Sequence, residues 1–229
     1  MKMTRVNMGF TLLEIMVAIF ILSILAGSIF FFYERSSTAI HETSRQLELF
    51  DKATVAMQVV LEDIESTSLL INDIDGKKVI FPAVLLQKNM SGSMDADLLS
   101  LLAVSPPAGV REGMKGRVRV RFFCREIKGK LALFRLVDEI SSAEDMLENN
   151  TPTDEEVRQA DPVVTGLTGV RFVIEDDQGA AYEDWPTGAL DDSEKKPRTV
   201  MVTLKFQEDK DTPPRSFTGR ALLPPSTFP

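Results

Sequence analysis

The chain has 229 residues, of which 44% are hydrophobic and 26% are charged, enough for one membrane segment and one compact domain but not for a multidomain machine. Its net charge is −8, or −10 without Lys2 and Arg5 near the N-terminus, and such an acidic surface disfavours direct contact with nucleic acid or anionic lipid. Cys124 is the single cysteine, which excludes an internal disulfide.

An apolar segment near the N-terminus carries one carboxylate at its head. The stretch from Ile15 to Tyr33 has no charged residue, and a bilayer-spanning helix needs about 20 apolar residues. Glu14 directly precedes it, although an acid at mid-membrane costs roughly 2.5 to 3.5 kcal/mol. An acid in this place is therefore a functional candidate that requires a partner. Cleavage between Gly9 and Phe10 would supply one, because Phe10 would then carry a free amine.

The residues around this bond form a specific pattern. The string Gly9-Phe10-Thr11-Leu12-Leu13-Glu14, after a short basic leader, resembles the class III signal of type IV prepilins and pseudopilins. The resemblance implies that a membrane peptidase cleaves after Gly9 and methylates the new N-terminus at Phe10. It also implies an assembly site made of Phe10, Thr11, Leu12, Leu13 and Glu14.

Two other interpretations compete for the same segment. An ordinary secretory signal peptide also has a basic start and an apolar core, and Ala26-Gly27-Ser28 would provide its cleavage site. The apolar run nevertheless continues past that site. A plain signal anchor explains the length of the segment and its basic leader, but it gives Glu14 no role.

After the apolar segment the pattern becomes amphipathic without a break. A stripe of helical spacing runs along Leu47, Phe50, Thr54, Met57, Leu61, Ile64 and Ser68. Proline is absent until Pro82, so we predict one helix from about Thr11 to about Leu70. We expect the stripe of its second half to lie across a sheet.

From Lys77 onward, strand patterns dominate. The strongest predicts a hairpin of Gly116 to Arg125 and Lys130 to Asp138, joined at Lys128-Gly129. Its arginines, Arg117, Arg119 and Arg121, indicate either a basic patch or a solvated or acid-paired sheet face, and we favour the second. Further strands are predicted in five segments: 79–81, 98–104, 170–175 and the closing pair 199–206 and 215–223. The acidic stretch 141–161 is predicted to be a mobile loop or a short surface helix.

The sequence therefore predicts an α+β, pilin-like fold with a long N-terminal helix packed on an antiparallel β-sheet domain. The expected parts are a leader peptide over 1–9, a membrane-spanning helix half over 10–33, an amphipathic helix half over 34–70 and a β-rich domain over 71–229.

Catalytic or metal chemistry has little support in the sequence. His41, the single histidine, is expected in a solvated helix position, and Cys124 in a buried strand. We expect no enzyme activity, no cofactor and no metal. One alternative stays open, which is a calcium site formed by acidic side chains. The spacing of these acids matches no twelve-residue calcium loop. The six candidates are Asp176, Asp177, Glu183, Asp184, Asp191 and Asp192.

The later part of the chain is similar to the J class of minor pseudopilins of type II secretion. The similarity rests on Leu61 to Ile64, Leu167 to Phe172 followed by Trp185, and Pro197 to Val200. It implies a two-sheet domain in a subunit of the pseudopilus tip, which helps to initiate pseudopilus assembly for protein export. The implied partners are the I, K and H class minor pseudopilins, the major pseudopilin, the prepilin peptidase/methyltransferase and inner-membrane lipid, but no nucleic acid.

The basic leader predicts a single pass through the bacterial inner membrane, with a cytoplasmic N-terminus and a periplasmic domain. Two other functions remain open at this point. One is a minor pilin of a type IV pilus or a DNA-uptake filament. The other is an anchored enzyme or ligand-binding module.

Overall fold

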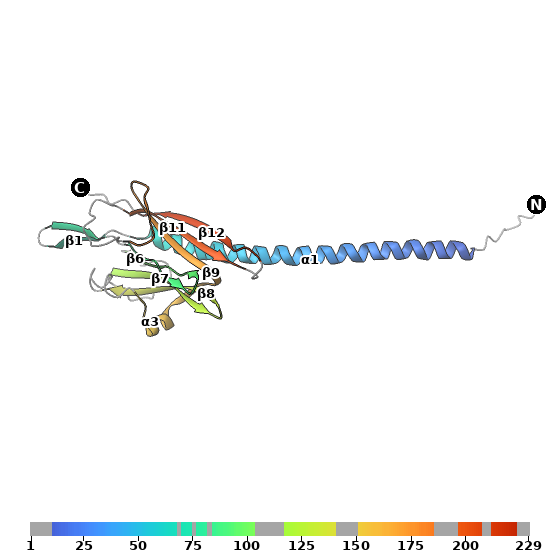
Figure 1. The fold of residues 1–229 in the computed structure, drawn as a ribbon, viewed down its shortest axis with the longest axis horizontal. Helices are drawn as coiled ribbons and strands as arrows, with labels where there is room; N and C mark the ends of the chain where they lie inside the picture. The colour runs from blue at the N-terminus through green and yellow to red at the C-terminus, as the bar shows by residue number, and fades with distance from the viewer. Residues whose placement is uncertain are drawn as a thin grey trace, which may run out of the picture. The chain divides into compact units, whose positions relative to one another are not determined.

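The structure is a computed structural model, which describes residues 11–67, 70–74, 77–81, 84–103, 117–140, 151–185, 197–207 and 212–223. The chain divides into two compact units, Met1–Asp51 and Lys52–Pro229, which we call the helical unit and the sheet unit. Helix α1 (Leu12–Glu65) contributes residues to both units (Figure 1).

Helix α1 is continuous because its sequence contains no proline and because the serine hydroxyls in its apolar part form hydrogen bonds within the helix. Ser23 and Ser28, inside the apolar stretch, each donate a hydroxyl hydrogen bond to the carbonyl four residues earlier, at 2.8 Å. At the other end, the hydroxyls of Ser66 and Thr67 both donate to the carbonyl of Asp63. Such side-chain bonds favour termination over another helical turn. The helix therefore ends at Glu65, before the predicted end near Leu70.

One large antiparallel sheet forms the body of the sheet unit. Its strands run in the order β12-β11-β9-β8-β7-β6-β3, and β10 pairs with β9 off this path. Two further sheets of two strands each, β1-β2 and β4-β5, are present in the described part of the chain, so the two-sheet arrangement implied by the resemblance is not what these residues form. The strands are β1 (Leu70–Ile74), β2 (Lys77–Phe81), β3 (Val84–Gln87), β4 (Met90–Ser91), β5 (Met94–Asp95), β6 (Leu98–Ala103), β7 (Arg117–Ile127), β8 (Lys130–Ile140), β9 (Asp161–Asp176), β10 (Ala181–Tyr182), β11 (Pro197–Phe206) and β12 (Arg215–Leu222).

The predicted hairpin is confirmed as β7-β8. Lys128 and Gly129 form its two-residue turn with φ of 54° and 77°. Two successive positive φ values match the twist of the flanking strands, and glycine adopts them without steric cost.

Strand β3, at the end of the sheet order, also pairs with the segment around Trp185. The backbones of Leu86 and Trp185 exchange two hydrogen bonds of 2.8 and 2.9 Å. Because β10, just before Trp185, pairs with β9, this segment connects β3 to the middle of the sheet order. Trp185 is 4% exposed and packs edge-on against Tyr182. The bridge covers part of the β3 edge with backbone hydrogen bonds.

Small residues of α1 face the sheet. Ala53, Ala56 and Val60 are buried, together with Asp63 and Ile64. Ile64 of the predicted stripe is confirmed as buried, but the preceding members are one position out of register, since Thr54 is exposed and Met57 and Leu61 are half-buried. The reason is side-chain size, because alanine lets the helix approach the sheet closely, whereas the larger stripe residues lie at its flank.

Strand β12 is adapted to this close approach. At Gly219, a Cβ atom would lie 2.6 Å from Sδ of Met57 and 3.0 Å from Cδ1 of Leu61. Glycine therefore lets Met57 and Leu61 lie directly against the strand backbone.

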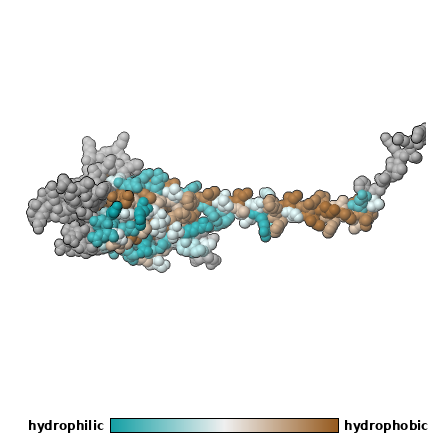
Figure 2. Space-filling view, turned by 90° about the horizontal axis from the view of Figure 1, so that it is seen from above, coloured by the Kyte–Doolittle hydropathy of each residue, from teal (hydrophilic) through white to brown (hydrophobic). Residues whose placement is uncertain are grey.

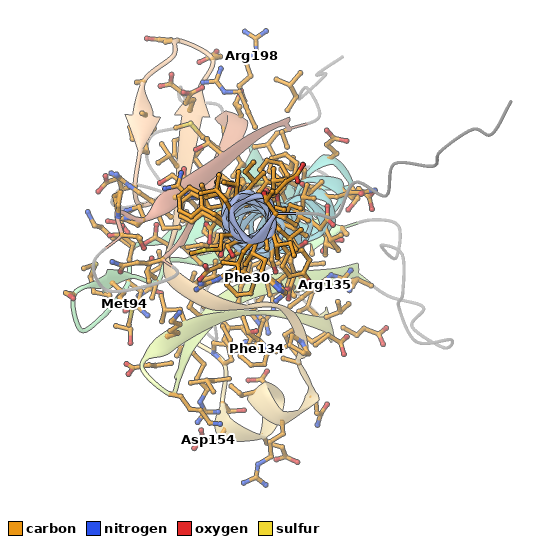
Figure 3. The ribbon with its side chains drawn as sticks, turned by 90° about the vertical axis from the view of Figure 1, so that its right-hand side faces the viewer. Phe30, Met94, Phe134, Arg135, Asp154 and Arg198 are labelled. Carbon is orange, nitrogen blue, oxygen red and sulfur yellow. The ribbon has the colours of Figure 1, made fainter. Side chains whose placement is uncertain are left out.

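The opposite face of the sheet carries a second, smaller core under helix α3 (Asp154–Gln159). Leu98, Phe123 and Leu136 are buried there, with Phe134, Val157 and Ala160 packed against them. In Figure 3, Phe134 points toward this side, and its neighbour Arg135 points toward α1. For the acidic stretch, the short-helix alternative is confirmed by α3, while 141–150 lie outside the described residues. The first half of β9 was not anticipated.

Candidate assembly site at the N-terminus

Thr11 is the cap of helix α1. The backbone N–H of Glu14 lies 3.3 Å from Oγ1 of Thr11 and 3.0 Å from its carbonyl oxygen. A side-chain oxygen in this position satisfies a donor that has no partner within the helix. Thr11 thus fixes where α1 begins, directly after the predicted cleavage site.

Glu14 lies in the first turn of α1 and is exposed, as are Leu12 and Leu13. A carboxylate in the first helical turn is favoured by the partial positive charge of the helix N-terminus. The first part of α1, from Leu12 to Tyr33, therefore presents an apolar surface with one acid near its start. Gly9 and Phe10 lie outside the described residues, so their predicted roles in cleavage and methylation stay predictions.

The apolar part of α1 has the dimensions of a membrane span. At about 1.5 Å per residue, Ile15 to Tyr33 rise about 28 Å, close to the roughly 30 Å of a bilayer's hydrocarbon core. On the face shown in Figure 2, most of the N-terminal part of α1 is covered by hydrophobic side chains. Among the described residues, α1 is the helix long and apolar enough to cross a membrane, and no residue of its apolar window is buried. This part of α1 fits a single-pass membrane anchor.

Charged residues reappear at the C-terminal end of the apolar stretch, beginning with Glu34 and Arg35. The guanidinium of Arg35 lies 4.6 Å from the centre of the Phe31 ring. A cation over an aromatic face is attracted by the ring quadrupole, and amphipathic groups of this kind gather at membrane boundaries. If one boundary lies near Arg35, Glu14 lies at the other.

Comparison with known proteins bears on this same segment. Residues 9–30 match the family model of the prokaryotic N-terminal methylation motif. The match indicates a type IV pilin-like prepilin. It covers the predicted cleavage site, Glu14 and most of the span of this prepilin, and it does not extend into the sheet unit. No curated protein sequence matches the chain.

The sheet unit contains one buried ion pair that the sequence analysis did not identify. Nε of Arg135 lies 2.5 Å from Oδ2 of Asp63, and Nη2 lies 3.0 Å from Oδ1. The side chains are 9% and 5% exposed. The pair joins β8 to α1. The sequence does contain a signal for this pair. Asp63 and Arg135 each lie among apolar residues whose spacing predicts burial.

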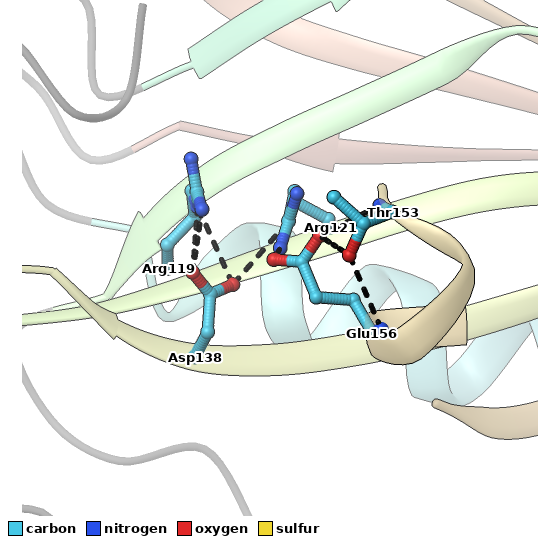
Figure 4. Close-up of polar contacts among 5 residues, drawn as sticks. All are labelled: Arg119, Arg121, Asp138, Thr153 and Glu156. Carbon is cyan, nitrogen blue, oxygen red and sulfur yellow. Dashed lines mark hydrogen bonds and ion pairs between the residues drawn. The ribbon is translucent and has the colours of Figure 1, made fainter. Parts of the chain in front are cut away.

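A second buried network lies beneath α3 (Figure 4). Arg119 donates to Asp138 from Nη2 at 2.6 Å, and Arg121 forms ion pairs with Asp138 and Glu156. Arg121 is fully buried and Arg119 is 4% exposed. The acid-paired interpretation is therefore confirmed for these two arginines, while the side chain of Arg117 lies outside the described residues.

Glu156 has two structural roles in this network. Its carboxylate accepts hydrogen bonds from the backbone and hydroxyl of Thr153, the N-cap of α3, and from Arg121. Burial alone would raise the pKa of Glu156, but these hydrogen bonds outweigh it and hold the pKa below its usual value. Glu156 therefore acts as a carboxylate that joins the start of α3 to β7.

The remaining candidates show no reactive arrangement. Burial raises the pKa of the Cys124 thiol to about 12, which makes the thiolate scarce. His41 is exposed on α1, as predicted. Among the described residues no three potential metal ligands cluster, and Asp176 accepts hydrogen bonds from Gln178, Ala180 and Tyr182 instead. Asp191 and Asp192, of the calcium alternative, lie outside the described residues.

The capping role of Thr11 was also missed, although its signal is present in the sequence. Thr11-Leu12-Leu13-Glu14 has the spacing of a capping box, in which Ser or Thr is followed three residues later by Glu. The residues predicted for assembly thus include those that start the helix. The described residues among them, Thr11 to Glu14, form one contiguous helical turn.

Proposed function

We propose that this prepilin is a minor pseudopilin of a type II secretion system, a structural subunit of the pseudopilus tip that helps to initiate assembly. The observation that carries the proposal is the methylation-motif match at residues 9–30, together with an exposed apolar helix that begins at the same place. Such a helix serves first as an anchor in the inner membrane and then as a packing surface in the filament.

The orientation in the membrane follows from charge. Lys2 and Arg5 precede the span, and positive residues next to a span remain on the cytoplasmic side. The sheet unit would then lie in the periplasm. Its acidic composition supports a structural role over direct binding of nucleic acid.

Assembly would use the carboxylate of Glu14. Once Gly9 has been removed with the leader, Phe10 has a free, positively charged amine. The amine of Phe10 on a neighbouring subunit would then pair with the Glu14 carboxylate. At about 4 Å such a pair contributes roughly 4 kcal/mol at an effective dielectric of 20, before desolvation is subtracted. The pair therefore sets the register between subunits more than it adds stability.

Support for the J class comes from the later segments. The Leu167 to Phe172 segment lies within β9, Pro197 to Val200 opens β11, and Trp185 forms a bridge with Leu86 of β3. We propose that the I, K and H class subunits and the major pseudopilin are its partners in the tip. The prepilin peptidase/methyltransferase would be its processing enzyme.

Deletion of the gene in its host tests this function. Exported enzymes in the medium and surface pili are scored on the same cells. We expect export to be lost while pili remain. Loss of pili with normal export would instead assign the chain to a type IV pilus, and no change in either would refute both assignments.

A further inference from the structure

The sheet unit has a groove between α1 and the edge strand β12. Its volume is about 390 Å³. One wall is the flank of α1 that carries the predicted stripe, and the other is Phe217 and Thr218 of β12. The groove is lined by Ala53, Thr54, Met57, Gln58, Leu61, Glu62, Glu65, Phe217 and Thr218.

The helical wall has the spacing of a helix-packing seam. Thr54, Gln58, Leu61 and Glu65 follow one another at intervals of four, three and four residues, so they lie in one line along the flank of α1. This seam borders the face of α1 that packs on the sheet, because Leu61 also lies against Gly219 of β12. A helix laid along it would place side chains against Met57 and Leu61, with Phe217 on its other side.

Charge restricts what can occupy the groove. Among the described residues that line it, the charged ones are Glu62 and Glu65, both exposed. A second copy of this chain is a poor match, because its own amphipathic helix segment, residues 34–51, has more acids than bases: Glu34, Glu42, Glu48 and Asp51 against Arg35 and Arg45. Like charges brought together across an interface are unfavourable.

We propose that this groove receives an amphipathic helix from a different protein, one whose apolar stripe is flanked by lysine or arginine. The apolar stripe covers Met57, Leu61 and Phe217, and the basic residues pair with Glu62 and Glu65. The inference deepens the proposed function, on which it rests, by naming the surface and the chemistry of one partner subunit.

Site-specific photocrosslinking in the host membrane tests the inference on the full chain. A benzophenone amino acid is placed at Gln58, in the groove, and in a separate variant at Gln178. Gln178 is the matched control, because it is the same residue type, is exposed and is not among the residues that line the groove. We expect an adduct from Gln58 and not from Gln178. Mass spectrometry of the adduct should identify a helical segment of another protein with apolar residues at heptad spacing and adjacent lysine or arginine.

Charge reversal supplies the second arm. Glu62→Lys with Glu65→Lys should lower the adduct from Gln58 about tenfold or more, because like charges would then meet across the interface. Asp177→Lys with Glu139→Lys makes the same change in net charge at exposed positions outside the groove and should leave the adduct unchanged. An absent adduct, an adduct with a second copy of this chain, an equal adduct from Gln178, or an adduct that resists charge reversal would each overturn the proposal.

The two proposals fail separately. Processing of the N-terminus and the export phenotype test the pseudopilin assignment without reference to the groove. An export defect with no groove adduct would refute this inference alone. A groove adduct in cells whose export is normal without the protein would refute the assignment alone.

Discussion

At the scale of single residues, the ion pair of Asp63 and Arg135 connects the long helix to the sheet. Both side chains are nearly buried, and two hydrogen bonds of 2.5 and 3.0 Å join them. A buried pair of this kind is costly to break, since removing one partner leaves the other charge without compensation. We therefore expect it to fix the position of α1 on β8 more than to add net stability.

Asp63→Asn should lower the free energy of unfolding by about 3 to 5 kcal/mol. The measurement is denaturant unfolding of the mature chain in detergent, followed by the fluorescence of Trp185, the single tryptophan. Asp51→Asn, at an exposed position of the same helix, is the matched control. Replacing the pair by Asp63→Leu with Arg135→Met should recover most of the loss. Equal stability of Asp63→Asn and the control would contradict the role of the pair.

Glu156 predicts a dependence on pH. Because the pKa of Glu156 is lowered in the folded protein, its ionisation stabilises the fold above the usual value of 4.5, and this contribution is lost as pH falls through the lower, folded value. The wild type should lose more stability on acidification below 4.5 than Glu156→Gln does. Unfolding curves measured across this range for both proteins test it, and parallel losses would exclude Glu156 as a contributor.

Glu14 predicts a separation between processing and assembly. Glu14→Gln removes the charge but keeps the size, so the chain should still be cleaved while its incorporation into the filament falls. Glu34→Gln, a charge removed beyond the other end of the span, is the control. Immunoblots of membrane and sheared-filament fractions measure both steps. Normal incorporation of Glu14→Gln would argue against pairing with the Phe10 amine.

At the scale of secondary-structure elements, α1 presents two different flanks to its surroundings. Ala53 and Ala56 face the sheet, and the larger Met57 and Leu61 line the groove. The small residues set the distance between helix and sheet, because interiors are close-packed and tolerate little added volume.

Ala56→Leu should therefore destabilise the sheet unit by about 1 to 3 kcal/mol through overpacking, since Ala56 is fully buried. Val55→Leu is the matched control at the neighbouring position, which is 61% exposed, and it should change stability by less than about 0.5 kcal/mol. The same Trp185 unfolding assay compares them. If Ala56→Leu matched Val55→Leu, the assigned buried face of α1 would be wrong.

These elements also show how far the sequence predicts the fold. The hairpin β7-β8 was predictable because alternation and a Lys-Gly turn are local signals. The buried face of α1 was placed one residue out of register because hydrophobicity identified Met57 and Leu61, whereas close packing selected Ala53 and Ala56. The first half of β9 was missed because an acidic segment precedes it and its pairing with β8 is a long-range contact.

The candidate assembly site at the N-terminus was more predictable from the sequence than the buried face of α1. Its motif is a fixed spacing of Gly9, Phe10 and Glu14, which sequence shows directly. The cap at Thr11 was also visible as a Thr-x-x-Glu spacing. The ion pair of Asp63 and Arg135 could not be identified as a pair, since the sequence places its members far apart.

At the scale of the whole molecule, the chain combines an apolar helical unit with an acidic sheet unit. The apolar stretch of the helical unit, Ile15 to Tyr33, has the length of a membrane span and overlaps the matched methylation motif. The sheet unit has its own core and internal ion pairs. In the proposed function, the membrane anchor and the assembly site meet at the first turn of α1.

The mass and N-terminal sequence of the protein isolated from host membranes test the central claim most directly. The account predicts a chain that begins at Phe10 and carries one added methyl group on its amine, while Gly9→Val keeps the leader. A wild-type chain that retains Met1, or one that begins after Ala26-Gly27-Ser28, would contradict it.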